Sequence, residues 1–108
     1  MSDPLSEPEF RLTADTALET LERALLPLAD EHDFEVEQQN GVLQISFEEP
    51  TAERFIVSPN APVRQIWLSA MARGYKLSWS AEAGAFMLDG ETLCDMTERL
   101  VHEFLGTA

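Results

Sequence analysis

The fold is decided by residues 34–47, whose sequence is FEVEQQNGVLQISF. Apolar and polar residues alternate on both sides of Asn40-Gly41, a pair that favours a two-residue turn because both positions tolerate a positive φ. This pattern predicts a β-hairpin with one buried face. Further short segments of strand character follow the hairpin, separated by Pro, Asn or Gly, at residues 54–58, 65–69, 75–79 and 85–88.

Helical periodicity is restricted to the two ends of the chain. One helix is expected from residue 9 to residue 28, where Pro27 should bend or stop it. A second helix is expected after Asp89-Gly90, with Gly106 as its stop. Their apolar residues recur every three or four positions: Leu18, Leu21, Leu25 and Leu28 in the first helix, and Leu93, Met96, Leu100 and Phe104 in the second. This order predicts an α+β fold, a two-layer sandwich with both helices on one face of an antiparallel sheet of five or six strands.

The length of 108 residues is that of one domain, so residues 1–108 are expected to form a single unit with residues 1–8 as a disordered lead. The lone Cys94 excludes an internal disulfide framework and fits a reducing compartment. The chain has no apolar run of about 20 residues, the length that a membrane span needs, and its first residues (MSDP) lack the basic character of a signal peptide. These features predict a cytoplasmic protein.

Negative charge is concentrated in the first half of the chain. Twenty acidic residues against seven basic ones give a net charge of −13. Residues 1–53 contain fourteen of the acids and two of the bases, whereas residues 54–108 contain six acids and five bases. This asymmetry argues against nucleic acid or an anionic membrane as a partner, because phosphates would be repelled. It favours a cation or a basic protein surface, although such charge also simply keeps a protein in solution.

Part of this charge follows helical spacing. Asp15, Glu19 and Glu22 are spaced i, i+4, i+7 and therefore share one stripe of the first helix, about 110° from the middle of its leucine face. If the first strand lies at the sheet edge beside this helix, the acids of the following turn and strand extend the stripe into a ridge. We use the name acidic ridge for the eight residues Asp15, Glu19, Glu22, Asp30, Glu31, Asp33, Glu35 and Glu37.

Carboxylate oxygens are the ligands that hard cations such as Fe²⁺ and Fe³⁺ prefer, and a bound cation would relieve the like-charge crowding of the acidic ridge. Spacing alone nevertheless favours an ordinary solvated helix face. The sequence has no calcium-loop, H-x-x-E or C-x-x-C pattern, so any metal site here is expected to be shallow and weak. It also contains no arrangement typical of a catalytic triad or a phosphate-binding loop.

A second candidate surface lies in residues 65–69, QIWLS. The pleat of a strand sends Ile66 and Leu68 to one face, where they should pack beneath the helices. The other face carries Gln65, Trp67 and Ser69. An exposed tryptophan is typical of a binding hot spot. The alternative, that Trp67 packs against Tyr75 or another residue of its own sheet face, stays equally open.

Four segments resemble the frataxin family in sequence and in order: residues 41–47 (GVLQISF), 62–69 (PVRQIWLS), 74–75 (GY) and 89–93 (DGETL). The resemblance covers residues 9–106, and QIWL at 65–68 followed by GY is its most specific part. It implies the two-layer fold already predicted from the pattern. It further implies a non-enzymatic, iron-binding protein, monomeric without metal and without an organic cofactor, that docks on a cysteine desulfurase and its scaffold protein to regulate iron–sulfur cluster assembly.

The resemblance also implies roles for particular residues. Trp67, with Gln65 beside it, would contact the assembly partners. Late in the first helix, where relatives carry acids, this chain has Leu26, Pro27 and Ala29, so the acidic ridge is thinner there. The iron ligands would be Glu22, Glu31, Asp33, Glu35 and Glu37, with Asp15 and Glu19 earlier on the same helix.

Two other functions remain as alternatives. The first is an acidic α/β secretion chaperone that binds a protein segment; such chaperones are usually dimers in which a helix interrupts the strands, and no helix is predicted between residues 34 and 88. The second is oxidation of iron on the acidic ridge. This would require turnover beyond what free carboxylates support.

Overall fold

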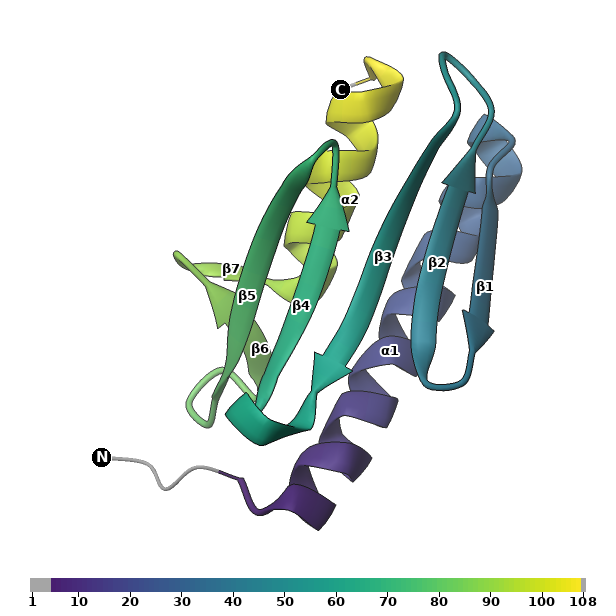
Figure 1. Cartoon of the computed structure of the whole chain (residues 1–108). Coiled ribbons are helices and arrows are strands. Elements are labelled where there is room, and N and C mark those ends of the chain that lie inside the picture. The colour runs from purple at the N-terminus through teal and green to yellow at the C-terminus, as the bar shows by residue number, and fades with distance from the viewer. Residues whose placement is uncertain (1–4, 108) are drawn as a thin grey trace.

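The computed structural model describes residues 5–107, which form two layers (Figure 1). Helices α1 (Glu7–His32) and α2 (Leu93–Leu105) cover one face of an antiparallel sheet whose seven strands follow one another in sequence order. The predicted α+β sandwich is confirmed, with one strand more than expected. The strands are β1 (Glu35–Gln39), β2 (Val42–Phe47), β3 (Glu53–Asn60), β4 (Gln65–Ala70), β5 (Arg73–Ser80), β6 (Ala85–Leu88) and β7 (Glu91–Thr92), and the 3-10 helix η1 (Ala61–Val63) joins β3 to β4.

Helix α1 begins earlier than its apolar pattern indicates. The Ser6 hydroxyl accepts a hydrogen bond from the Glu9 backbone N–H at 3.3 Å, and the Glu9 carboxylate accepts one from the Ser6 N–H at 3.1 Å. This reciprocal pair satisfies two N–H groups that have no partner in the first turn. The expected disordered lead is therefore wrong for Ser6 to Pro8, while residues 1–4 lie outside the described part of the chain.

Helix α1 also continues past Pro27 to His32, so of the two expected effects of Pro27, a bend or a stop, the stop is wrong. A proline inside a helix has no N–H to donate to the carbonyl four residues earlier, here that of Arg23. Pro27 and Arg23 are both exposed, so water can reach this carbonyl. The helix ends at Asp33, which has a left-handed φ of 61° and donates its N–H to the Ala29 carbonyl. Asp30 and Glu31, expected in a turn, consequently belong to the last helical turn.

The core fills the space between the helices and the inner face of the sheet. Its ring cluster centres on Phe47, whose centroid lies 4.9 Å from Phe34, 5.0 Å from Phe55 and 4.8 Å from Phe104. The largest fully buried side chains are Phe10, Phe55, Phe86, Leu18, Leu21, Leu25, Leu43, Ile45, Ile66, Leu68, Leu77 and Leu100. None of the helices within residues 5–107 is long and apolar enough to cross a membrane.

Two leucines on α1 test how much this core contributes. Leu18 is completely buried, whereas 71% of Leu12 is exposed. We predict that Leu18→Ala lowers the free energy of unfolding by about 2–5 kcal/mol, through lost burial and the cavity left behind. Leu12→Ala makes the same chemical change on the same helix and should shift it by no more than about 0.5 kcal/mol. Urea denaturation followed by circular dichroism measures both, and equal losses would contradict the assigned burial.

Candidate functional site

The first part of the acidic ridge runs along one flank of α1. Asp15 and Glu19 are exposed and Glu22 is partly buried. Arg11, Ala14 and Asp15 line a shallow pocket together with residues 40–42 of the β1–β2 turn, so this flank faces the β1 side of the sheet. Asp30 follows eleven residues after Glu19, about three helical turns, and continues the stripe.

Strand β1 has the position that the ridge hypothesis requires. It is the edge strand of the sheet formed by residues 5–107, and it packs beside α1. Val36 pairs with the buried Ile45 and therefore faces the helices. Glu35 and Glu37 alternate with it and point to the outer face of the sheet. The acids of α1 and the two acids of β1 therefore lie on different faces of the sheet. They are neighbours only across the β1 edge.

The structure does not bring all eight ridge residues together. Glu31 follows Glu22 by nine residues, two and a half helical turns, which places it on the opposite flank of α1. Its carboxylate Oε2 lies 3.9 Å from Nε2 of His32. Asp33 occupies the C-cap. The expected continuous ridge is therefore divided, because consecutive acids at a helix end point in different directions.

No preformed metal cage results from this arrangement. Within residues 5–107, no group of three or more His, Cys, Asp or Glu side chains is placed to hold a metal ion. The nearest positive charge on the stripe is Arg23, whose Nη2 lies 3.9 Å from Oε2 of Glu19. The stripe thus offers a high density of negative charge to a cation or a basic surface. To coordinate a metal ion, its carboxylates would have to move together when the ion binds.

The second candidate surface is the outer face of the sheet around Trp67. This indole is 37% exposed, and its Nε1–H donates to Oε1 of Gln65 at 2.9 Å. The Lys76 ammonium lies 4.9 Å from the ring centroid, within reach of a cation–π contact. Tyr75 pairs with Leu68 and so belongs to the opposite face, which excludes a contact between Trp67 and Tyr75. The other part of that alternative holds, because Trp67 packs against Lys76 of its own sheet face. Trp67 is held on its own face by Gln65 and Lys76, while Ser69 is exposed.

Lys76 is a site residue that the sequence pattern did not reveal. It pairs with Trp67 across a hairpin whose turn residues, Met71 and Ala72, both have positive φ values of 51° and 64°. Such turns usually contain Gly or Asn, so no local signal marked the centre of this hairpin. Arg54 adds a second base to the same face, in register with Ser46 and thus in one row with Glu35. The outer face is therefore acidic at β1 and basic from β3 onward.

The chain is similar to known proteins over nearly its whole length. The family model of the frataxin-like domain matches residues 3–107. The iron-sulfur cluster assembly protein CyaY of Pseudomonas fluorescens (strain Pf0-1) is 35% identical over 107 residues, 95% of this chain and 92% of that protein. The CyaY protein of Cupriavidus metallidurans is 36% identical over 74 residues, covering 67% of this chain and 65% of that one. A solved structure of frataxin from Psychromonas ingrahamii shares the fold, with a TM-score of 0.77, 18% identity and coverage of 92% and 90%.

Like-charge crowding on the α1 flank leads to a prediction about stability. The triple variant Asp15→Asn/Glu22→Gln/Asp30→Asn should raise the Tm at low ionic strength, because it removes repulsion from a chain of net charge −13. In 1 M NaCl, where the Debye length is about 3 Å, the difference from wild type should disappear. Thermal scans at both salt concentrations measure it.

Glu91→Gln is the matched control, because this carboxylate is not crowded but paired. Arg99 donates to both of its oxygens at 2.8 Å, and these hydrogen bonds hold the pKa of Glu91 below its ordinary value. A carboxyl group with a depressed pKa stabilises the fold at neutral pH and loses that contribution as the pH falls through its folded-state pKa. Glu91→Gln should therefore lower the Tm at neutral pH. A lower Tm for the triple variant would contradict the crowding argument.

Proposed function

Because this chain belongs to the frataxin family, we propose that it is a regulatory adaptor of iron–sulfur cluster assembly that binds iron weakly and docks on a cysteine desulfurase and its scaffold protein. The observation that carries the proposal is the segregation of charge. The first 53 residues contain fourteen acids and two bases, and α1 and β1 collect most of these acids at one end of the sheet. The matched relatives are named as iron-sulfur cluster assembly proteins.

The α1 flank supplies the electrostatic half of the docking surface. Asp15, Glu19, Glu22 and Asp30 extend over four turns of a rigid helix, so a basic patch on the partner can meet several carboxylates at once. Exposed charges of this kind mainly accelerate encounter and orient the complex, and their effect falls with added salt. Binding through this flank is therefore expected to be strongly salt-dependent.

The outer sheet face supplies an apolar anchor. Trp67 offers a large rigid ring whose burial would contribute far more than the polar side chains around it. Gln65 and Lys76 already hold the ring in place, so little conformational entropy is lost when a partner covers it. Lys76 must then either remain stacked on the ring inside the interface or move aside.

Charge neutralisation on the flank tests this docking. The variant Asp15→Asn/Glu19→Gln/Glu22→Gln/Asp30→Asn should bind a purified bacterial cysteine desulfurase more weakly than wild type by about tenfold or more at 50 mM salt, with a flatter salt dependence. Calorimetry or biolayer interferometry measures the Kd. The control Glu48→Gln/Glu49→Gln/Glu82→Gln/Asp89→Asn removes the same charge from exposed positions elsewhere.

The outcome separates the two surfaces. Equal weakening in both charge variants would show that only net charge matters and would contradict a role for the α1 flank. Trp67→Ala should weaken binding at all salt concentrations, because the lost contact is apolar. Failure of folded wild type to bind at low salt, with or without Fe²⁺, would remove the desulfurase from the proposal.

Iron binding gives a separate prediction. Without a three-ligand group, Fe²⁺ should bind weakly and lose affinity step by step as single acids are removed, whereas a true cage would fail after one substitution. Anaerobic NMR titration should broaden amides from Asp15 of α1 to its C-cap Asp33, and those of β1, before those of β4 to β6. The four-residue α1 variant should lose this preference, and uniform broadening in wild type would contradict it.

A further inference from the structure

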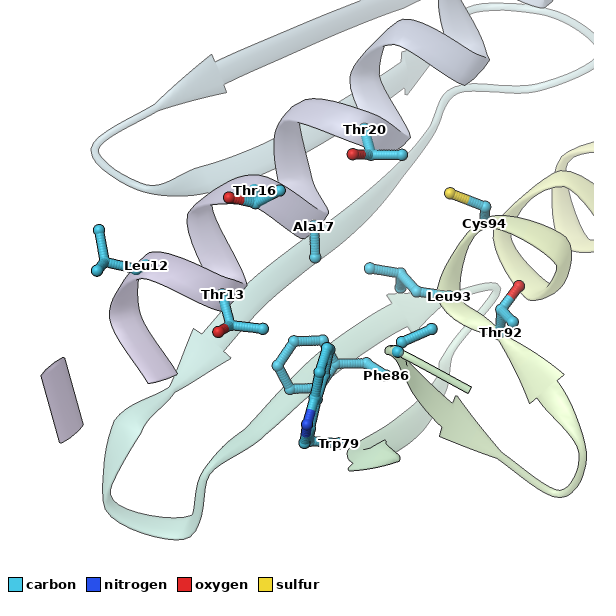
Figure 2. A pocket seen from close by; sticks show the side chains of 12 residues that line it. Leu12, Thr13, Thr16, Ala17, Thr20, Trp79, Phe86, Thr92, Leu93 and Cys94 are labelled. Atoms are coloured by element: carbon cyan, nitrogen blue, oxygen red, sulfur yellow. The ribbon is translucent and has the colours of Figure 1, made fainter. Parts of the chain in front are cut away.

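A pocket lies on the side of α1 opposite the acidic stripe. Thr13, Ala17 and Thr20 of α1 face Leu93 and Cys94 at the start of α2, and Trp79 lies with Phe86 between the two helices (Figure 2). The cavity has a volume of about 340 Å³. This is at the lower end of the range of about 300–1,000 Å³ found for ligand pockets, and it suits one or two side chains better than a large cofactor.

The wall of this pocket is apolar and uncharged. The lining side chains comprise aliphatic, aromatic, threonine and cysteine groups, with no acidic or basic residue among those that the described structure places there. The indole of Trp79 packs against the Phe86 ring at 5.3 Å, which gives the floor a rigid aromatic surface. Such a wall fits an aliphatic or aromatic group and supplies no counter-charge to an anion inside it.

Acidic residues stand near the lining residues on both helices. Asp95 and Glu98 follow Cys94 by one and four residues, and burial together with these two negative charges raises the pKa of the Cys94 thiol. Glu9 stands one helical turn before Thr13 on α1. The nearby Arg99 is already engaged by Glu91 at 2.8 Å and Glu103 at 2.9 Å. The positive charge of Arg99 is thus neutralised within the protein, and Glu9 caps α1, whereas the carboxylates of Asp95 and Glu98 form no ion pair among the described residues.

The lining residues of α1 nearest the acidic stripe, Leu12, Thr16 and Thr20, are uncharged, and the next charged residue beyond them is Arg23, whose Nη2 lies 3.9 Å from Oε2 of Glu19. Leu12, 71% exposed, lies between Asp15 and Thr16 on the helix circumference, and Thr16 and Thr20 are exposed beside it. A segment that crosses the outer side of α1 would meet carboxylates on one flank and the apolar pocket on the other.

We propose that this pocket is a docking site for one aliphatic or aromatic side chain of a partner protein, carried on a segment with Lys or Arg on both sides of it. Charge complementarity selects this occupant, because the walls are apolar and acidic residues stand near them. A second copy of the chain is disfavoured, since two molecules of net charge −13 repel each other. The inference goes beyond the proposed function, as it does not depend on the partner being a cysteine desulfurase.

Three acetylated and amidated five-residue peptides test the proposal. Each has a central phenylalanine, flanked on both sides by two lysines, two serines or two glutamates. Trp67→Phe leaves Trp79 as the only tryptophan, so its fluorescence reports on the pocket. The lysine peptide should bind most tightly and the glutamate peptide about tenfold or more weakly. A lysine peptide with serine in place of phenylalanine should leave Trp79 emission unchanged.

Pocket-filling variants separate the pocket from the acidic stripe. Ala17→Met should abolish the Trp79 response, while Ala24→Met, two turns further along α1 and outside the lining, should retain it. Thr20→Leu fills the same space from an exposed position and replaces Ala17→Met if that variant does not fold.

Three results would each overturn the proposal. They are equal affinity for the three peptides, an unchanged response in folded pocket-filling variants, and a dimer of wild type that the pocket-filling variants abolish in sedimentation experiments. The last would assign the pocket to a second copy of the chain. The peptide experiment tests the pocket independently of the desulfurase, so a failure of desulfurase binding would leave the proposal for the pocket unaffected.

Discussion

Two helices must cover one face of a single antiparallel sheet, and the rest of the structure follows from this constraint. Phe10, Leu18 and Leu25 of α1 are completely buried against the inner face. Consecutive strands of the meander are neighbours in the sheet, so α1 precedes the first strand and α2 follows the last one. Both helices lie on the same side of the sheet (Figure 1). The outer face has no second layer within residues 5–107, so its residues contact solvent or a partner.

The burial of α1 also divides the rest of its surface into two flanks. One flank carries Asp15, Glu19 and Glu22 and faces the β1 edge. The other carries Thr13, Ala17 and Thr20 and faces α2 across the apolar pocket. The same helix therefore offers electrostatic attraction and apolar contact side by side, which is the combination that specific protein interfaces use.

Charge and packing reinforce this division. Negative charge on α1 and β1 disfavours self-association and anionic ligands, whereas Arg54 and Lys76 make the centre of the outer face basic. Trp67 stands in this basic region, stacked beneath Lys76 and bonded to Gln65. The acidic flank and the tryptophan face thus belong to two distinct surfaces on either side of the β1 edge, and a partner that contacts both must reach around it.

The sequence by itself determined the layers of this protein, the inward residues of the first hairpin and of residues 65–69, and the acidic stripe of α1, because helical and strand periodicities are local and report which residues share a face. Only the tertiary structure decided that Pro27 stays within a helix, that Glu31 leaves the stripe and that Lys76 covers Trp67. It also created the pocket, whose walls come from α1, β5, β6 and α2. Contacts between segments distant in the chain depend on turn geometry and packing, which leave no periodic signal in the sequence.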